Sequence, residues 1–213
     1  SLTIKNIARN SSRQLRVLGK MHRERVRWLS AQDDSKLTDE SLAIEEAHIK
    51  QRKWQLFKIA GIGQLKDAIS LAEEFRDMSA LVELIVELQD QAKGGNIQQG
   101  VSGEDSHVDE DLKRFGQRVA GYFERFGESW ADAFFSRQIS VGQPGVLLAM
   151  RSYQPYVTRF LRKAPSRSRL GWINDIIGEN DYNTASRSLE NLAIENESDL
   201  WSQRVEISLA KLT

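Results

Sequence analysis

A turn-and-helix motif recurs along the chain, and it is the feature that most constrains the fold. In each copy a helical run ends near a glycine, a short polar turn follows, and the next helix carries an early alanine. The first copy contains Gly63 and Ala68, the second contains Gly178 and Ala185, and a weaker third turn contains Gly142. Glycine ends helices at low cost because it adopts the left-handed conformation freely. The motif is typical of stacked helical pairs.

Helical periodicity extends over nearly the whole chain. Apolar residues recur at helical spacing from the first helix, expected at 4–30, to the last, expected at 198–212, and no segment alternates as a strand does. Only three prolines occur in 213 residues, which favours long helices. We therefore predict an all-α fold, an irregular α-solenoid of stacked helical hairpins with about eleven helices.

Polar and glycine-rich segments predict how the helices are divided. Thr38 or Asp39 is the expected N-cap of the second helix, and Asp77 is the expected N-cap of the fourth. The Gly, Gln and Ser content of 94–107 predicts a flexible loop. The expected parts of one continuous solenoid are a basic N-terminal helix and break (1–36), the first part of the stack (37–93), the flexible loop (94–107) and the second part of the stack (108–213).

Composition excludes several classes of protein. The formal net charge is +0, which argues against nucleic acid as the main partner. The chain has no cysteine, so disulfides, zinc–thiolate sites and thiol catalysis are excluded. No apolar run has the length of a membrane span and no secretory signal is visible. Because the first residue is Ser and not Met, we expect a piece of a longer protein.

No set of residues has the spacing of a catalytic, metal or cofactor site. His22, His48 and His107 lack the i, i+4 pairing of a helical metal site, so we interpret them as exposed or incidental. Phosphate-loop and Gly-x-Ser-x-Gly motifs are absent. Neighbouring acids lie among Lys and Arg on polar helix faces, where carboxylates stay solvated; the pairs are Glu45/Glu46, Glu73/Glu74 and Glu195/Glu197. We predict a protein that is not an enzyme.

Charge is segregated along the chain, and each charged stretch has two interpretations. Residues 1–30 hold eight Lys or Arg and one acid, which predicts a solvent-exposed arm or a helix packed on acidic neighbours, with anionic membrane or RNA as the alternative contact. Residues 151–170 hold six Lys or Arg and no acid, and 171–200 hold seven Asp or Glu and one Arg. These are solvated faces or complementary docking patches.

Five tryptophans fall at apolar positions of the expected helices. Core packing is the simplest interpretation for all five. Trp28 and Trp201 are also candidate interface anchors, because tryptophan is enriched at binding hot spots.

Three passages share an order of residue types with a known family. They are the run from Trp54 to Leu84 with its Gly63 turn, the aromatic run Tyr122, Phe123, Phe126, Phe134 and Phe135 before Gly142, and the run Leu189-Glu-Asn-Leu192-Ala193 followed by Ser208-Leu209-Ala-Lys211-Leu212. Together they resemble the C-terminal helical domain of the 133-kilodalton scaffold nucleoporin family over roughly residues 40–213. The 155/170-kilodalton nucleoporins are the nearest similar family.

The resemblance implies a structural segment of the nuclear pore complex at the nuclear envelope. It implies support for nucleocytoplasmic transport of mRNA and protein through protein–protein contacts. The implied partners are the neighbouring scaffold nucleoporin of the Y-complex stalk and the rest of the same chain, an N-terminal propeller and further C-terminal helices. The alternative is a helical-repeat adaptor of a vesicle coat or trafficking complex, which such stacks also resemble.

The last expected helix carries apolar residues on two faces. Trp201, Val205, Leu209 and Leu212 form one stripe at helical spacing, and Leu200 and Ile207 share a second face. In the resembled family the chain continues into partner-binding helices. We therefore expect Leu200, Ile207 and the rim of Leu209 to bind a partner or those helices; burial of both faces within the chain is the alternative.

Overall fold

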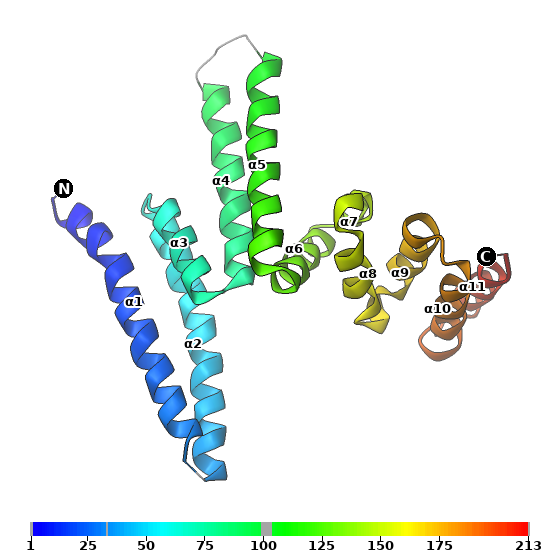
Figure 1. Ribbon diagram of the computed structural model, residues 1–213, viewed down its shortest axis with the longest axis horizontal. Coiled ribbons are helices and arrows are strands. Elements are labelled where there is room, and N and C mark those ends of the chain that lie inside the picture. Colours follow the sequence, from blue (N-terminus) through cyan, green and yellow to red (C-terminus); the bar gives the residue numbers. More distant parts are fainter. Residues whose placement is uncertain (1, 33, 99–103, 213) are drawn as a thin grey trace. The chain divides into compact units, whose positions relative to one another are not determined.

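The computed structural model describes residues 2–32, 34–98 and 104–212, and side chains within 10–32, 34–91 and 113–212. Within these residues there are eleven α-helices, three short 3-10 or π segments and no strand, so the all-α prediction is confirmed (Figure 1). The elements are α1 (Leu2–Ser30), α2 (Ser35–Gly61), α3 (Leu65–Phe75), α4 (Met78–Gln98), α5 (Glu104–Phe126), α6 (Glu128–Ser140), α7 (Pro144–Ala149), η1 (Arg151–Tyr153), α8 (Gln154–Arg162), η2 (Pro165–Arg167), α9 (Ser168–Asn174), η3 (Asp175–Glu179), α10 (Tyr182–Glu195) and α11 (Leu200–Leu212).

The chain divides into two compact units, residues 1–120 and 121–213, and their boundary lies inside α5. We expected the two parts of the stack to meet at 94–107. That they form one continuous solenoid stays a prediction.

The expected 94–107 loop is shorter than the sequence suggests. Helix α4 continues to Gln98 and α5 begins at Glu104, so 94–98 and 104–107 are helical, and 99–103 lie outside the described residues. A long helix accommodates glycine at a cost of about 1 kcal/mol per residue relative to alanine. The acids at the start of α5 suit the positive end of its dipole.

In the first unit, α1 packs on α2 and α3, and α4 packs on the same two helices. The core contains leucines from three helices that are at most 1% exposed: Leu56, Leu71, Leu81 and Leu84. Helices α1 and α3 meet at Gly19, where an added Cβ would lie 2.9 Å from Cε1 of Phe75. The N-terminal helix is therefore part of this unit's packing.

Two aspartates cap helices of the first unit. The carboxylate of Asp34 accepts a hydrogen bond of 2.8 Å from the Lys36 backbone N–H, so Asp34 is the N-cap of α2. The expectation of Thr38 or Asp39 is wrong, because both lie inside the helix. Asp77 accepts a bond of 3.1 Å from the Ala80 N–H, which confirms it as a cap.

In the turns of the motif, either glycine or asparagine adopts the left-handed conformation. Gly63 (φ +86°) and Gly142 (φ +72°) hold the left-handed conformation, as expected. In the second copy Asn180 holds it instead (φ 54°), because asparagine tolerates this region, and Gly178 lies within η3. An alanine at 178 would require the flexible side chain of Gln154 to move, because an added Cβ would lie 2.1 Å from its Nε2.

The motif alanines, Ala68 and Ala185, are completely buried. We expect Ala→Leu at either position to lower the free energy of unfolding by roughly 1–3 kcal/mol, because the added atoms overpack a closed contact. Thermal melting followed by circular dichroism measures the effect. The same change at the exposed Ala43 of α2 is the control. If both buried variants melt at the wild-type temperature, the sites of Ala68 and Ala185 have space for a larger side chain.

The second unit has an aromatic core. The rings of Trp130 and Tyr122 lie 4.7 Å apart between centroids, and those of Phe135 and Phe160 lie 5.4 Å apart. Phe123 stacks on Tyr153 at 3.9 Å. Helices α5, α6 and α8 are thus joined through ring contacts.

Ion pairs use part of the segregated charge inside the second unit. Lys163 lies 2.7 Å from Glu128 and 2.6 Å from Asp132. Arg162 lies 2.8 Å from the buried Asp175, whose pKa is raised by burial against the opposing effect of this arginine. The basic and acidic stretches therefore contact each other or their neighbours within one chain.

Candidate interaction surfaces

Helix α11 is attached to α10 mainly by small and polar residues. The Ser186 hydroxyl donates to the Ala210 carbonyl at 2.7 Å, and the Gln203 amide donates to the Ala193 carbonyl at 2.9 Å. Ala210 joins a small cluster of buried residues against which Trp172 packs. The inward face of α11 is therefore not its most apolar face.

Arg169 of α9 fixes the same helix from the other side. Its Nε donates to Oε1 of Glu206 at 2.8 Å, and its Nη2 pairs with Glu197. Glu206 is only 7% exposed, and its hydrogen bond is the main cause of a raised pKa at Arg169. The charge pair therefore links α9 to α11.

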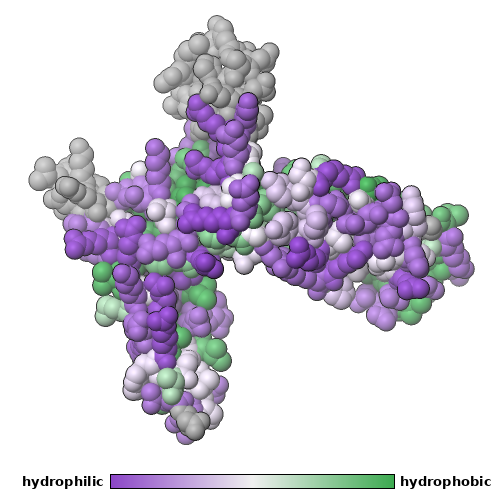
Figure 2. All heavy atoms as spheres, viewed as in Figure 1, coloured by the Kyte–Doolittle hydropathy of each residue, from purple (hydrophilic) through white to green (hydrophobic). Residues whose placement is uncertain are grey.

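The apolar stripe of α11 is most exposed at its two ends. We call Trp201, Val205, Leu209 and Leu212 the C-terminal apolar face; Trp201 is 73% exposed and Leu212 is 83% exposed, whereas Val205 is half-buried. Leu200, at the start of the helix, is also exposed. Figure 2 shows hydrophobic surface where α11 lies.

The three expected partner-binding residues differ in their exposure to solvent. Leu200 is on the surface and Leu209 is 36% exposed, whereas Ile207 is half-buried beside the packed side of α11. Ile207 flanks that side because Gln203, Glu206 and Ala210 make the contacts with the other helices. Partner binding by Leu200, Ile207 and Leu209 stays a prediction.

The tryptophans differ in exposure. Trp130 is completely buried and Trp172 is partly buried, whereas Trp28, Trp54 and Trp201 are 58–73% exposed. The core interpretation is therefore wrong for these three, because each projects from the outer side of its helix. The exposure of Trp28 and Trp201 is what an interface anchor requires.

Helix α1 packs on acidic neighbours, one of the two expected arrangements. Arg16 lies 2.8 Å from Glu74 of α3, and Arg25 lies 3.4 Å from Glu40 of α2. It also carries exposed apolar residues at i, i+4 and i+11, namely Val17, Met21 and Trp28. Hydrophobic surface beside α1 and α2 is visible in Figure 2.

Two histidines that are remote in sequence lie together. The rings of His22 and His48 stack with centroids 3.9 Å apart. Burial, with smaller effects of His22 and Arg52, lowers the pKa of His48 to about 4. The interpretation of these two as incidental is wrong, since they form part of the α1–α2 contact; the side chain of His107 lies outside the described residues. No metal-binding group of three or more His, Cys, Asp or Glu occurs among the side chains that the structure describes.

The described helices include none that is long and apolar enough to cross a membrane. Exposed apolar residues lie on α1 in the first unit and on α11 in the second.

Comparison with known proteins identifies the family. The family model for the non-repetitive/WGA-negative nucleoporin C-terminal region matches residues 3–213. The chain belongs to this nucleoporin family. It is 25% identical over 194 residues to nucleoporin NUP133 of Chaetomium thermophilum and 26% identical over 218 residues to nucleoporin nup132 of Schizosaccharomyces pombe. The resemblance to the 133-kilodalton nucleoporin is confirmed.

The matches cover 89% and 98% of this nucleoporin chain but only 14% and 16% of the two relatives. The chain thus corresponds to a small part of each relative. No solved structure matches it.

Proposed function

We propose that the chain is a non-enzymatic scaffold segment of the nuclear pore complex, at the nuclear envelope. It supports nucleocytoplasmic transport of mRNA and protein by holding other proteins in place. The family match over residues 3–213 carries this proposal. The helical architecture supports it, because stacked helices offer long surfaces for protein contacts.

The partners in this proposal are other nucleoporins. The neighbouring scaffold nucleoporin of the Y-complex stalk is the first of them. Contacts with an N-terminal propeller and further C-terminal helices of the same protein are the second. The C-terminal apolar face, with Leu200 beside it, is the surface we assign to such contacts, because exposed tryptophan and leucine side chains gain free energy when a partner covers them.

Affinity isolation of the full-length protein tests the scaffold role. Nucleoporins of the Y complex should dominate the co-purified proteins. The family match favours the pore over the alternative, an adaptor of a vesicle coat. Recovery of coat subunits in place of nucleoporins would refute the pore assignment.

We expect Trp201→Glu in the full-length protein to weaken binding to the stalk neighbour by about tenfold or more. A buried tryptophan at an interface is commonly worth at least about 2 kcal/mol, and glutamate adds a desolvation cost. Binding of the purified proteins is measured by calorimetry. Val141→Glu, a similar change at an exposed residue between α6 and α7, is the control. Equal affinity of the two variants, with wild-type melting, would remove Trp201 from the interface.

A further inference from the structure

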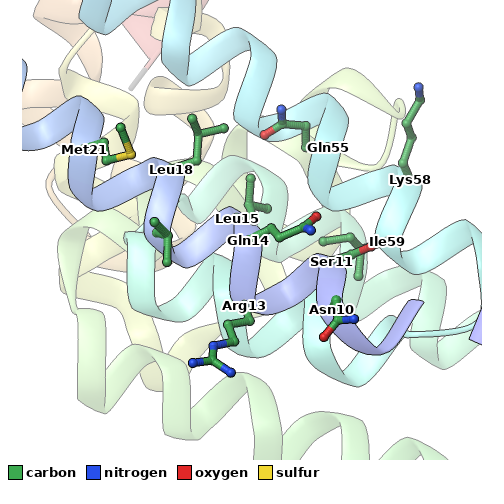
Figure 3. Close-up of a pocket in the computed structure, with 11 residues that line it drawn as sticks. Asn10, Ser11, Arg13, Gln14, Leu15, Leu18, Met21, Gln55, Lys58 and Ile59 are labelled. Carbon is green, nitrogen blue, oxygen red and sulfur yellow. The ribbon is translucent and has the colours of Figure 1, made fainter. Parts of the chain in front are cut away.

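A groove lies between α1 and α2 in the first unit, away from the C-terminal apolar face in sequence. Its volume is about 750 Å³. Figure 3 shows the side chains that line it, from residues 10–21 of α1 and 55–59 of α2. No role described above uses this groove.

The floor of the groove is apolar. Leu15 and Ile59 are nearly buried, and Leu18 lies beside them. Val17 and Met21 form an exposed edge, 52% and 64% exposed. A floor of this kind favours aliphatic or aromatic side chains of a ligand.

The walls carry two cations. Arg13 extends from α1 and Lys58 from α2 (Figure 3), and neither forms an ion pair with any residue that the structure describes. Nζ of Lys58 lies 3.3 Å from the centroid of the Trp54 ring, which holds the ammonium at the surface. The groove therefore offers an apolar floor flanked by positive charge.

We propose that this groove binds an acidic amphipathic helix of a partner protein. One or two apolar side chains of that helix occupy the floor, at helical spacing, as in other helix-in-groove complexes. Its Asp or Glu side chains pair with Arg13 and Lys58, which sets its orientation.

The shape of the groove favours a protein ligand over a lipid surface. The groove is concave and lies between two helices, so it matches a single helix better than a flat bilayer. The experiment therefore also measures binding to anionic vesicles.

Selection from a random peptide library displayed on phage tests the proposal without a known partner. The bait is the 213-residue protein. We expect enriched peptides with Leu, Ile, Phe or Met at i, i+3 or i+4 and with several Asp or Glu. Enrichment of basic peptides, or no enrichment over the vector, would overturn the proposal.

Charge reversal tests whether selected peptides occupy this groove. The double variant Arg13→Glu/Lys58→Glu should bind a selected peptide about tenfold or more weakly, because attraction becomes repulsion at both walls. Arg151→Glu/Arg204→Glu, at exposed positions of the second unit, is the control and should bind like wild type. Fluorescence anisotropy gives the affinities, and thermal melting confirms folding. Equal binding by both variants, or binding of phosphatidylserine vesicles without binding of any peptide, would refute a protein ligand.

Discussion

Replacing Trp130 with alanine should lower the free energy of unfolding by about 3–5 kcal/mol, the largest effect we expect of a single substitution. The indole is completely buried, and its ring contacts those of Tyr122 and Phe134 at 4.7 Å and 5.8 Å. Alanine would leave a cavity that the surrounding rings cannot fill without leaving their positions. Denaturant unfolding followed by circular dichroism measures the loss.

Trp130→Phe distinguishes the contribution of the buried aromatic ring to stability from that of the indole N–H. The buried indole N–H has no hydrogen-bond partner among the described residues, so phenylalanine removes an unsatisfied donor while keeping an aromatic ring in place. We expect this variant to lose less than half as much stability as Trp130→Ala. Equal losses would mean that the indole itself, and not the filled volume, stabilises α6 against α5.

Acidification to about pH 5 should destabilise the first unit by about 2 kcal/mol relative to pH 7 through His48. Its pKa is about 4 in the folded protein against an ordinary value of 6.5. Between these values the unfolded chain binds a proton that the folded chain does not bind. Stability is therefore full above about pH 6.5 and falls as the pH approaches 4.

His48→Gln identifies the source of this loss. Glutamine does not titrate, so the stability of the variant should change much less between the two pH values. A pH near 5 is chosen because most carboxylates stay ionised there. If wild type and His48→Gln lose stability in parallel, then the His22–His48 stack opens to solvent and does not exclude the proton.

Local signals in the sequence predict much of this fold. Helical spacing places most of the helices, and Gly63, Gly142 and Asp77 act at the positions that their chemistry requires. Such features depend on only a few neighbouring residues. Where two residues that favour the left-handed conformation are close together, as with Gly178 and Asn180, the local sequence does not show that Asn180 is the one that adopts it.

The surfaces are harder to predict, because they depend on contacts between remote residues. Nothing near His22 indicates His48 as its neighbour, since the stack exists only once α1 lies on α2. The orientation of α11 is similar: Glu206 lies inward, where it pairs with Arg169, 37 residues away in sequence. The apolar stripe of α11 does not indicate this contact.

The polar attachment of α11 also fixes its register. Burial of apolar area has no preferred direction, whereas a hydrogen bond loses strength over a few tenths of an ångström. If α11 slid along α10, the bonds from Ser186 to Ala210 and from Gln203 to Ala193 would break together with the Arg169 pair. The C-terminal apolar face is consequently held in one position relative to α10. Because the helix is already ordered, binding of a partner there does not lose affinity to the entropy of ordering it.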